Sequence, residues 1–327
     1  MQAPDPMLLQ AFELLDAQRE QEALVLFRQL AERNDPGALA TLAQLNWTGT
    51  IVPRDYTKGR DYYYRAGEAG HPICAIYSTN LLASGYAGHR DWKLALERLR
   101  REAAHDPARA EILSTLARMD LTDEGDPAVI PQGEPLSEKL EVQLFHGAFS
   151  HAECDYLFRL EKRDYARASV VDEASGTERI DPVRTADETH IDWEIENPLV
   201  HVFNRRLAAM SRTHVHQGEP LQLLRYRPGQ QYFNHYDYIP GAANQRIKTA
   251  LLYLNDDYSG GETGFPRLNL RVKAHKGDVL LFRNAQSDGR REQDSEHAGM
   301  PVLSGVKHIA TRWIRTQAYT ARSLSGD

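Results

Sequence analysis

The stretch Tyr232-Phe233-Asn234-His235-Tyr236-Asp237-Tyr238 decides both the fold and the chemistry of this chain. Its His-x-Asp motif is followed by His297, 62 positions after His235 (297 − 235), and by Lys307, ten positions further on (307 − 297). Two imidazoles and one carboxylate can occupy one face of an octahedral Fe(II) and leave three coordination positions open. The spacing therefore predicts His235, Asp237 and His297 as metal ligands, with Lys307 as a cation for the far carboxylate of a dicarboxylic keto acid.

The His-x-Asp motif alone is weak support, because the chain contains it three times. The other copies are His89-Arg90-Asp91 and His190-Ile191-Asp192, and His151-Ala152-Glu153 is a near match. The copy at His190 is the serious competitor, because it is followed by further histidines at His201, His214 and His216. Only the sequence around each copy separates them.

The sequence around His235 carries a series of motifs in a fixed order. They are Leu224-Arg225-Tyr226-Arg227-Pro228-Gly229-Gln230, Gln245-Arg246-Ile247-Lys248-Thr249, Tyr253-Leu254-Asn255-Asp256, Gly260-Gly261-Glu262-Thr263-Gly264-Phe265-Pro266, His297-Ala298-Gly299-Met300-Pro301-Val302 and Trp313-Ile314. This order resembles the prolyl 4-hydroxylase branch of the 2-oxoglutarate/Fe(II) dioxygenases over residues 137–320. The resemblance implies a double-stranded β-helix of the jelly-roll type. His235 and Asp237 would lie at a strand end, with His297 opposite them at the mouth.

The resemblance also implies roles for individual residues. The three metal ligands would form the catalytic iron site. Lys307 would pair with the C5 carboxylate of 2-oxoglutarate, and Thr249 would add a hydrogen bond to that carboxylate. A buried lysine on a strand requires such an anion, because an unpaired charge is costly to bury. The cosubstrate and substrate side would be lined by three aromatic residues, Tyr226, Tyr232 and Trp313.

Arg184-Thr185 resembles the Arg-Thr-Ser of the loop that closes over the substrate in this family, with Ala186 in place of the serine. We therefore expect Arg184 and Thr185 to contact the substrate. The surrounding residues 176–196 are polar and poorly periodic, which is typical of a mobile lid. An ordinary surface loop remains the alternative.

The implied reaction is hydroxylation of a C–H bond with Fe(II), 2-oxoglutarate and O2, which yields succinate and CO2, with ascorbate rescuing oxidised iron. The resemblance favours a prolyl residue (4-hydroxylation) of a protein or peptide as the acceptor. Another amino-acid side chain or a small molecule stays open as acceptor, as does a partner-binding repeat protein with a secondary oxygenase domain. A nucleic-acid demethylase would need a basic face, and the net charge of −7 argues against it.

The first third of the chain contains a repeat. Asn34-Asp35-Pro36, Gly70-His71-Pro72 and His105-Asp106-Pro107 recur at intervals of 36 and 35 positions. Helix-period segments lie between these marks, at residues 8–15, 23–31, 38–45, 59–66, 77–82, 92–99 and 110–119. A period in the mid-thirties with paired helices is typical of tetratricopeptide-type solenoids. The sequences of residues 52–56 and 66–72 resemble the Sel1-like variant. Such an array either holds the protein acceptor or serves only as a scaffold.

The chain is therefore predicted to be an α+β protein with a helical repeat domain at 1–121, a linker at 122–136 and a dioxygenase domain at 137–320. In the dioxygenase domain, Ser150 and Glu153 form a capping box that opens a helix. A second helix is expected from Leu199 to Met210. Strands are expected at residues 140–145, 222–226, 249–254, 271–274, 278–282 and 309–315.

The composition of the 327 residues, 41% hydrophobic and 26% charged, is ordinary for a globular protein. The negative net charge and the lack of an apolar run of about 20 residues give no support for nucleic-acid or membrane binding. Residues 1–6 show no signal-peptide pattern. Cys74 and Cys154 fall in different predicted domains, so we expect buried free thiols, a reducing compartment and a cytoplasmic location.

Overall fold

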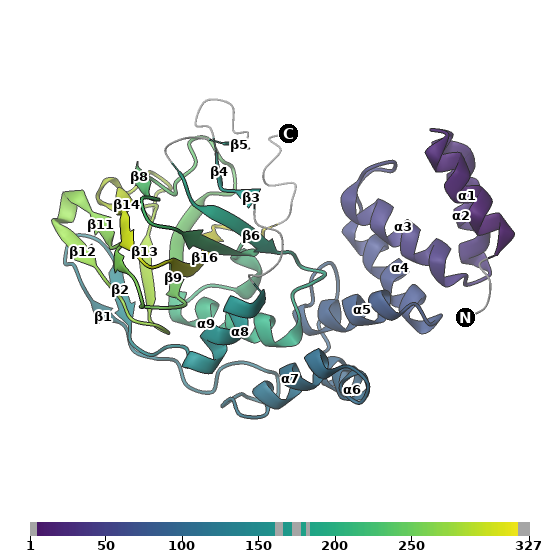
Figure 1. Cartoon of the computed structure of the whole chain (residues 1–327), viewed down its shortest axis with the longest axis horizontal. Helices are drawn as coiled ribbons and strands as arrows, with labels where there is room; N and C mark the ends of the chain where they lie inside the picture. The colour runs from purple at the N-terminus through teal and green to yellow at the C-terminus, as the bar shows by residue number, and fades with distance from the viewer. Residues whose placement is uncertain (1–4, 161–165, 172–177, 181–183, 320–327) are drawn as a thin grey trace. The chain divides into compact units, whose positions relative to one another are not determined.

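The computed structural model describes residues 5–160, 166–171, 178–180 and 184–319. Its packing divides the chain into two compact units, whose elements are labelled in Figure 1. The first unit comprises Met1–Met119 together with Trp193–His201, and the second comprises Asp120–Asp192 together with Val202–Asp327. The first unit therefore includes a short segment from the middle of the sequence.

The first unit consists mainly of successive helices. They are α1 (Pro6–Asp16), α2 (Glu20–Glu32), α3 (Pro36–Thr48), α4 (Tyr56–Glu68), α5 (Pro72–Ser84), α6 (Trp92–Ala103) and α7 (Pro107–Leu116). Six of the seven predicted helical segments fall within these helices, and the seventh, 110–119, extends past the end of α7 at Leu116. The prediction of a helical array is confirmed.

The repeat in the sequence is a repeat of helix ends. Asp35 and Asp106 precede α3 and α7, and each carboxylate accepts a hydrogen bond from a backbone N–H of the first turn. These bonds satisfy donors that a helix start leaves free. At the other end, Gly49 and Gly85 close α3 and α5 with φ of 72° and 71°, a left-handed conformation that favours glycine. The spacing of 36 therefore sets the length of a helix pair.

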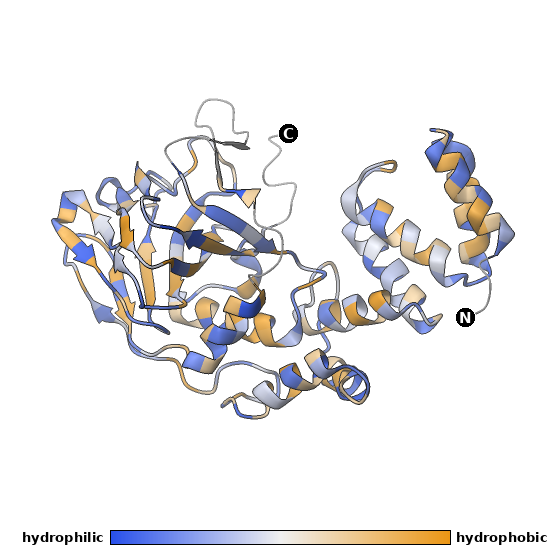
Figure 2. Ribbon diagram, in the orientation of Figure 1, coloured by the Kyte–Doolittle hydropathy of each residue, from blue (hydrophilic) through white to orange (hydrophobic). Residues whose placement is uncertain are grey.

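The helices of the first unit enclose a core of buried side chains that includes Leu24, Phe27 and Leu39. Figure 2 shows the corresponding orange positions along the helices. A Cβ atom at Gly67 would lie 2.8 Å from the Cα of Ala75, so α4 and α5 approach each other closely at this point.

The second unit is built on two sheets. The major sheet has the order β1-β2-β13-β9-β16-β7-β6-β3, and the minor sheet has the order β12-β11-β14-β8. The strands of the major sheet are β1 (Glu134–Pro135), β2 (Val142–Phe145), β3 (Ala166–Arg167), β6 (Asp187–Ile191), β7 (Leu221–Tyr226), β9 (Arg246–Tyr253), β13 (Val279–Arg283) and β16 (Lys307–Arg315). Those of the minor sheet are β8 (Tyr232–His235), β11 (Thr263–Phe265), β12 (Leu270–Val272) and β14 (His297–Gly299).

Two short ribbons complete the strands that the structure describes. They pair β4 (Ser169–Val171) with β5 (Glu178–Ile180), and β10 (Ser259–Gly260) with β15 (Val302–Ser304). The core of the unit draws on both main sheets, since Phe265 of β11 packs edge-on against Phe282 of β13 with ring centroids 5.2 Å apart. This antiparallel two-sheet arrangement confirms the predicted jelly-roll fold.

Two helices accompany the major sheet, α8 (His151–Leu160) and α9 (Pro198–Ser211). The predicted capping box opens α8, because the Ser150 N–H donates to Glu153 Oε2 at 2.7 Å and the Glu153 N–H donates to Ser150 Oγ at 3.3 Å. The two helices are joined by an ion pair of 2.9 Å between Glu153 and Arg206. They brace one side of the sheet.

Two predictions about irregular segments need correction. The last residues of the expected linker, Glu134–Pro135, form β1 and pair with Gln143 and Leu144 at the sheet edge. Part of the expected lid, Asp187–Ile191, is the strand β6, which pairs along β7. The sequence did not predict this strand because its residues are mostly polar. Glu188 of this strand is buried among ionic and polar partners instead of apolar ones. Residues 176–177 and 181–183 of the expected lid lie outside the described residues.

Among the residues that the structure describes, no helix combines the length and the hydropathy that crossing a membrane would require.

Candidate active site

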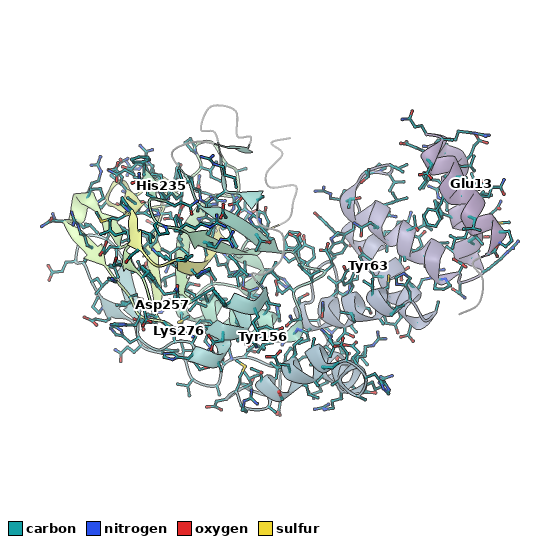
Figure 3. The ribbon with its side chains drawn as sticks, in the orientation of Figure 1. Glu13, Tyr63, Tyr156, His235, Asp257 and Lys276 are labelled. Atoms are coloured by element: carbon teal, nitrogen blue, oxygen red, sulfur yellow. The ribbon has the colours of Figure 1, made fainter. Side chains whose placement is uncertain are left out.

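The predicted metal ligands converge at one end of the two-sheet unit. His235 is the last residue of β8, His297 is the first residue of β14, and the two face each other as a register pair. Asp237 follows β8 directly. Figure 3 shows His235 at one end of this unit and Asp257 and Lys276 at the other. The site therefore lies at an end of the minor sheet.

The distances among the three side chains suit a single metal ion. Nε2 of His235 lies 3.6 Å from Oδ1 of Asp237, and Nε2 of His297 lies 3.6 Å from Oδ2 of the same carboxylate. All the candidate ligand atoms lie within 4.8 Å of one another. In the described ranges this is the one group of three His, Cys, Asp or Glu residues arranged to hold an ion.

Backbone carbonyls fix the tautomers of both histidines. Nδ1 of His235 lies 2.8 Å from the carbonyl oxygen of Phe233, and Nδ1 of His297 lies 2.9 Å from that of Ser295. A carbonyl oxygen only accepts, so each Nδ1 carries the proton and donates it. Each Nε2 therefore presents a lone pair toward the carboxylate, as a metal ligand must.

Ionisation of the site also favours metal binding. Burial, reinforced by the neighbouring His297, lowers the pKa of His235 to about 3, so its imidazole is neutral at physiological pH. Burial alone would raise the pKa of the Asp237 carboxyl. The two histidines, the Arg246 guanidinium and the Thr249 hydroxyl outweigh burial and bring that pKa below its ordinary value. The site therefore presents the neutral imidazole of His235 beside an ionised Asp237 carboxylate.

The competing His-x-Asp copy has no such arrangement. The His190 side chain is exposed, and its Nε2 lies 3.0 Å from the amide nitrogen of Gln222. Asp192 is exposed as well. Because the residues around them bring no second histidine into range, this pair does not form a metal site in the described chain.

A cavity of about 400 Å³ opens beside the metal ligands. Lys307 lies in it, only 3% exposed, and its Nζ donates to the carbonyl oxygen of Gly261 at 2.7 Å. Burial, opposed in part by Glu262, lowers the pKa of this amine to about 8. A buried ammonium with one neutral acceptor is incompletely compensated. An anionic ligand in the cavity would complete its coordination.

Two further donors on the same strand face the cavity, and neither has a hydrogen-bond partner among the residues that the structure describes. They are the Thr311 hydroxyl and the Trp313 indole N–H, both buried. Residues 307, 309, 311 and 313 of β16 alternate along the strand, so all four share one face. Buried polar groups are normally hydrogen-bonded. Their partners here would therefore belong to a bound ligand.

The turn before β11 is shaped by consecutive glycines. Gly260 and Gly261 have φ of 69° and 68°, and a Cβ at Gly260 would lie 2.4 Å from the carbonyl oxygen of Pro301. Only glycine is free of strain in such a position. The turn presents the Gly261 carbonyl to Lys307 and starts the strand that carries Thr263 into the cavity.

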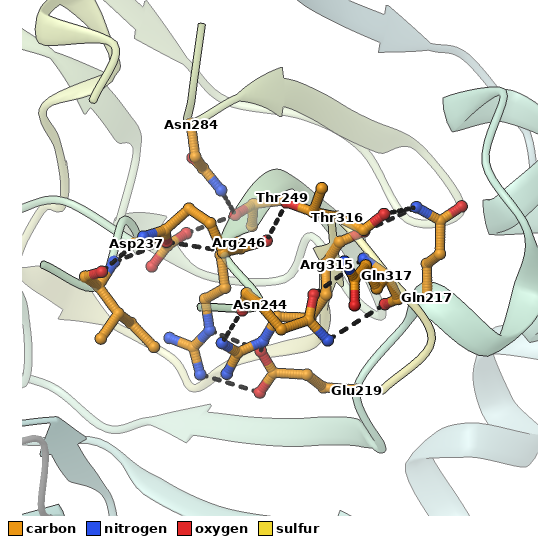
Figure 4. Close-up of polar contacts among 12 residues, drawn as sticks. Gln217, Glu219, Asp237, Asn244, Arg246, Thr249, Asn284, Arg315, Thr316 and Gln317 are labelled. Carbon is orange, nitrogen blue, oxygen red and sulfur yellow. Dashed lines mark hydrogen bonds and ion pairs between the residues drawn. The ribbon is translucent and has the colours of Figure 1, made fainter. Parts of the chain in front are cut away.

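Thr249, predicted to bind the cosubstrate, contacts a predicted metal ligand in the structure. It is fully buried and is not among the residues that line the cavity. Its hydroxyl donates to Oδ2 of Asp237 at 2.6 Å and accepts from the Asn284 amide at 2.8 Å (Figure 4). The predicted hydrogen bond to the cosubstrate stays a prediction, while the contact that exists is with a metal ligand.

The threonine that does line the cavity is Thr263, whose hydroxyl lies 2.8 Å from that of Tyr253. Sequence reasoning missed it. The signal was the double glycine two positions earlier, which marks a sharp turn and therefore a change of direction into the barrel. Tyr226, Tyr232 and Trp313 line the same cavity, as expected.

Of the two residues predicted to contact the substrate, one lines the cavity and the other does not. Arg184 lies in the cavity wall, its guanidinium 5.0 Å from the ring centre of Tyr232 and hydrogen-bonded to Gln222 at 2.7 Å. Thr185 does not line the cavity. Its hydroxyl and backbone instead exchange hydrogen bonds with the backbone of Gln231, which fixes the approach to β8.

A buried ionic cluster packs against Trp313 of the cavity wall. Arg246 donates to both carboxylate oxygens of Glu219 at 2.6 and 2.9 Å, and Arg315 donates to the same carboxylate at 2.6 Å (Figure 4). The Arg246 guanidinium also lies 3.7 Å from the ring centre of Trp313. This stacking holds the indole against the cavity.

The fold and the donor set define a 2OG-Fe(II) oxygenase, an enzyme that uses Fe(II) and 2-oxoglutarate. The family model of the 2OG-Fe(II) oxygenase superfamily matches residues 221–315, which contain all three predicted metal ligands and Lys307. Prolyl 4-hydroxylase 2 of Arabidopsis thaliana is 33% identical over 210 residues, or 56% of this chain and 70% of that relative. The chain belongs to the prolyl 4-hydroxylase family.

Two solved structures are similar to parts of the chain. The 2OG complex of the viral collagen prolyl hydroxylase vCPH from Paramecium Bursaria Chlorella virus-1 is 28% identical and covers 54% of this chain and 96% of its own, with a TM-score of 0.45. A Sel1 repeat protein from Oxalobacter formigenes is 25% identical and covers 33% of this chain and 86% of its own, with a TM-score of 0.31.

Proposed function

We propose that this enzyme hydroxylates a prolyl residue, at C4, in a protein or peptide. The main support is the cavity that joins the metal ligands to Lys307 on one side and to Arg184, Tyr232 and Trp313 on the other. One part is cationic and closed, which suits a dicarboxylate. The other is aromatic, which suits the apolar ring of proline.

In the bound enzyme, Fe(II), 2-oxoglutarate and O2 together supply the oxidising power, and the products are succinate, CO2 and the hydroxylated acceptor. Nε2 of His235 and of His297, with the Asp237 carboxylate, would hold the iron. Lys307 would bind the C5 carboxylate, assisted by Thr263 from β11. These contacts would fix the cosubstrate so that its other end reaches the metal.

The remaining residues would position the acceptor and keep water out. Tyr232 stacks on the His235 ring at 3.4 Å, so one aromatic surface is continuous from the metal ligand to the cavity wall. Arg184, held by Glu188 and Gln222, would donate to a main-chain carbonyl of the acceptor. Thr185 would act indirectly, by holding the approach to β8.

The acceptor would extend beyond the cavity. The first unit contains a separate groove of about 600 Å³ lined by both polar and apolar residues, among them Arg60, Tyr64 and His89. We infer that a protein acceptor uses this groove as a second contact. Remote binding energy of this kind can be used for positioning at the reacting carbon.

The cellular location is proposed to be the cytoplasm. Cys74 and Cys154 are both buried free thiols, and burial raises their pKa values to about 11 and about 12. Thiols kept protonated and unpaired suit a reducing compartment.

The proposal is tested with the purified full-length protein, Fe(II), 2-oxoglutarate, ascorbate and a panel of proline-containing peptides. We expect succinate to form with the peptide, and mass spectrometry to find one added oxygen on proline. Matched peptides with alanine in place of proline should gain no oxygen. Succinate formed with oxygen on another residue or on a small molecule would replace the prolyl acceptor but keep the oxygenase.

A further inference from the structure

The segment Trp193–His201 packs within the helical unit, although it follows β6 in the sequence. Trp193 is joined to the hydrophobic core of that unit. Its indole stacks on the Tyr86 ring with centroids 3.8 Å apart and planes at 15°. Close parallel stacking over a large area makes Trp193 the anchor of the segment.

The surface that receives Trp193 is an aromatic box made of Trp47, Tyr56 and Tyr86. Tyr56 meets Trp193 edge-on at 5.9 Å, and Trp47 meets Tyr56 and Tyr86 edge-on at 4.9 and 5.9 Å. The three rings come from α3, from α4 and from the residue after Gly85 that closes α5. Consecutive helices of the array therefore build the box together.

Two hydrogen bonds from the helical array contact the next residue, Glu194. The Trp47 indole N–H donates to Oε2 of Glu194 at 2.9 Å, and the Asn80 amide donates to the Glu194 backbone carbonyl at 2.9 Å. Asn80 is only 2% exposed, and Arg109 donates to its side-chain oxygen at 3.1 Å. The amide is thus oriented with its N–H groups toward the segment. One contact recognises a carboxylate and the other a backbone carbonyl in the turn formed by residues 193–195.

The end of the segment is also fixed. Asn197 accepts hydrogen bonds from the N–H groups of Leu199 and Val200 and so caps α9. Glu196 and His201, both buried, lie 2.7 Å apart. The segment is therefore held by an aromatic anchor, an acidic side chain and a helix start.

From this arrangement we propose that the aromatic box of the helical array is a binding site for a peptide turn with an aromatic residue followed by an acidic one, and that its resident ligand is the chain's own Trp193-Glu194. The array then acts as an anchor for the polypeptide that leaves β6.

A tethered ligand is present at high effective concentration, of millimolar order for a short connection. A free peptide of the same sequence therefore competes poorly with it. A protein acceptor must use another surface of the array, which agrees with the separate groove assigned to it above.

The test uses full-length protein with the box vacated by Trp193→Ala/Glu194→Ala. A fluorescent peptide of residues 189–198 should bind this variant, as measured by anisotropy, and should show at least tenfold weaker binding to the wild type. Adding Asn80→Ala to the vacated variant should weaken binding at least tenfold. Adding Val25→Ala, an exposed apolar change outside the box and outside the groove, should leave it unchanged.

A second measurement covers the case in which the vacated variant does not fold. Trp47→Phe keeps an aromatic side chain but removes the indole N–H donor. Amide hydrogen exchange at residues 193–197 should therefore accelerate severalfold, while that of α1 and α2 stays constant. The proposal is overturned if a folded vacated variant fails to bind the peptide. It is also overturned if exchange at 193–197 is the same in Trp47→Phe as in the wild type.

Discussion

The hydroxyl of Thr249, a residue of β9, donates a hydrogen bond of 2.6 Å to Oδ2 of Asp237. Asn284 donates to the same hydroxyl at 2.8 Å, so the hydroxyl proton is directed to the carboxylate. This chain of contacts fixes the rotation of the carboxylate and leaves its other oxygen, Oδ1, toward His235. Thr249 is therefore a positioning residue for the metal ligand.

Thr249→Val should weaken divalent-metal binding by about 10- to 100-fold, the usual effect of losing a partner that orients a ligand. The KM for 2-oxoglutarate, measured at saturating iron, should change much less. Co(II) titration followed by absorbance measures the first quantity without turnover. Thr249→Ser, which keeps the hydroxyl, is the control. A variant with normal metal affinity and a raised KM for 2-oxoglutarate would support the contact expected from sequence instead.

Lys307→Ala should raise the KM for 2-oxoglutarate by about two to three orders of magnitude, because losing one partner of a buried ion pair costs on the order of 3–5 kcal/mol. Metal affinity should be nearly unchanged. Lys307→Arg should rescue only in part, since a planar guanidinium needs different space. Lys273→Ala, which removes an exposed lysine, is the matched control. Wild-type dependence on 2-oxoglutarate in Lys307→Ala would remove this residue from the cosubstrate site.

The KM for 2-oxoglutarate should increase above about pH 8. Burial lowers the pKa of the Lys307 amine to about 8, so the free enzyme holds the required cation below that pH and loses it as the pH rises. Binding of the dicarboxylate stabilises the cation and pulls the titration upward in the complex. Initial rates between pH 6.5 and 9.5 measure the effect. The Lys307→Arg variant should show a flat KM over that range, and a wild-type KM that is equally flat would contradict the assignment.

Glu219→Ala should destabilise the second unit by about 3–5 kcal/mol, because it leaves Arg246 and Arg315 buried without their shared carboxylate. Asp288→Ala removes the partner of Arg290 in an exposed pair and should have only a small effect on stability, because solvent screens such a pair. Urea unfolding followed by circular dichroism gives both values. Equal effects of the two substitutions would show that the buried cluster contributes no more than a surface pair.

A truncated protein that starts at Ser137 should be less stable than the full chain and prone to association. It lacks the helices that cover Trp193, so an aromatic side chain and the segment around it become exposed. Thermal unfolding and light scattering measure this. Adding Trp193→Ser to the truncated protein should reduce association without restoring the stability. A monomeric truncation with the unfolding temperature of the full chain would show that the segment needs no cover.

The sequence predicted the parts of the fold that repeat a strong local pattern. The helix ends at Asp35, Gly49 and Gly85 recur at a fixed spacing, and the long strands β9 and β16 are continuous apolar or alternating runs. The predicted metal ligands could also be identified from the sequence, because His235, Asp237 and His297 stand in an ordered series of motifs. These features depend on neighbours in the sequence.

The missed features depend on neighbours in space. β8 and β14 have only four and three residues, too few for a periodicity to appear. Which threonine faces the cavity depends on strand register, so Thr249 and Thr263 could not be separated by residue type. Nothing local to Trp193 indicates that it packs with helices more than 70 positions earlier.

The incorporation of Trp193–His201 into the helical unit has a consequence for cleavage of the backbone. The polypeptide passes between the two units at 119/120, again at 192/193 and again at 201/202. A protease that nicks the chain between Gly125 and Gly133 would cut only the first of these passages. The two fragments would still share the Trp193 anchor, and they should elute together as a noncovalent pair until a denaturant separates them.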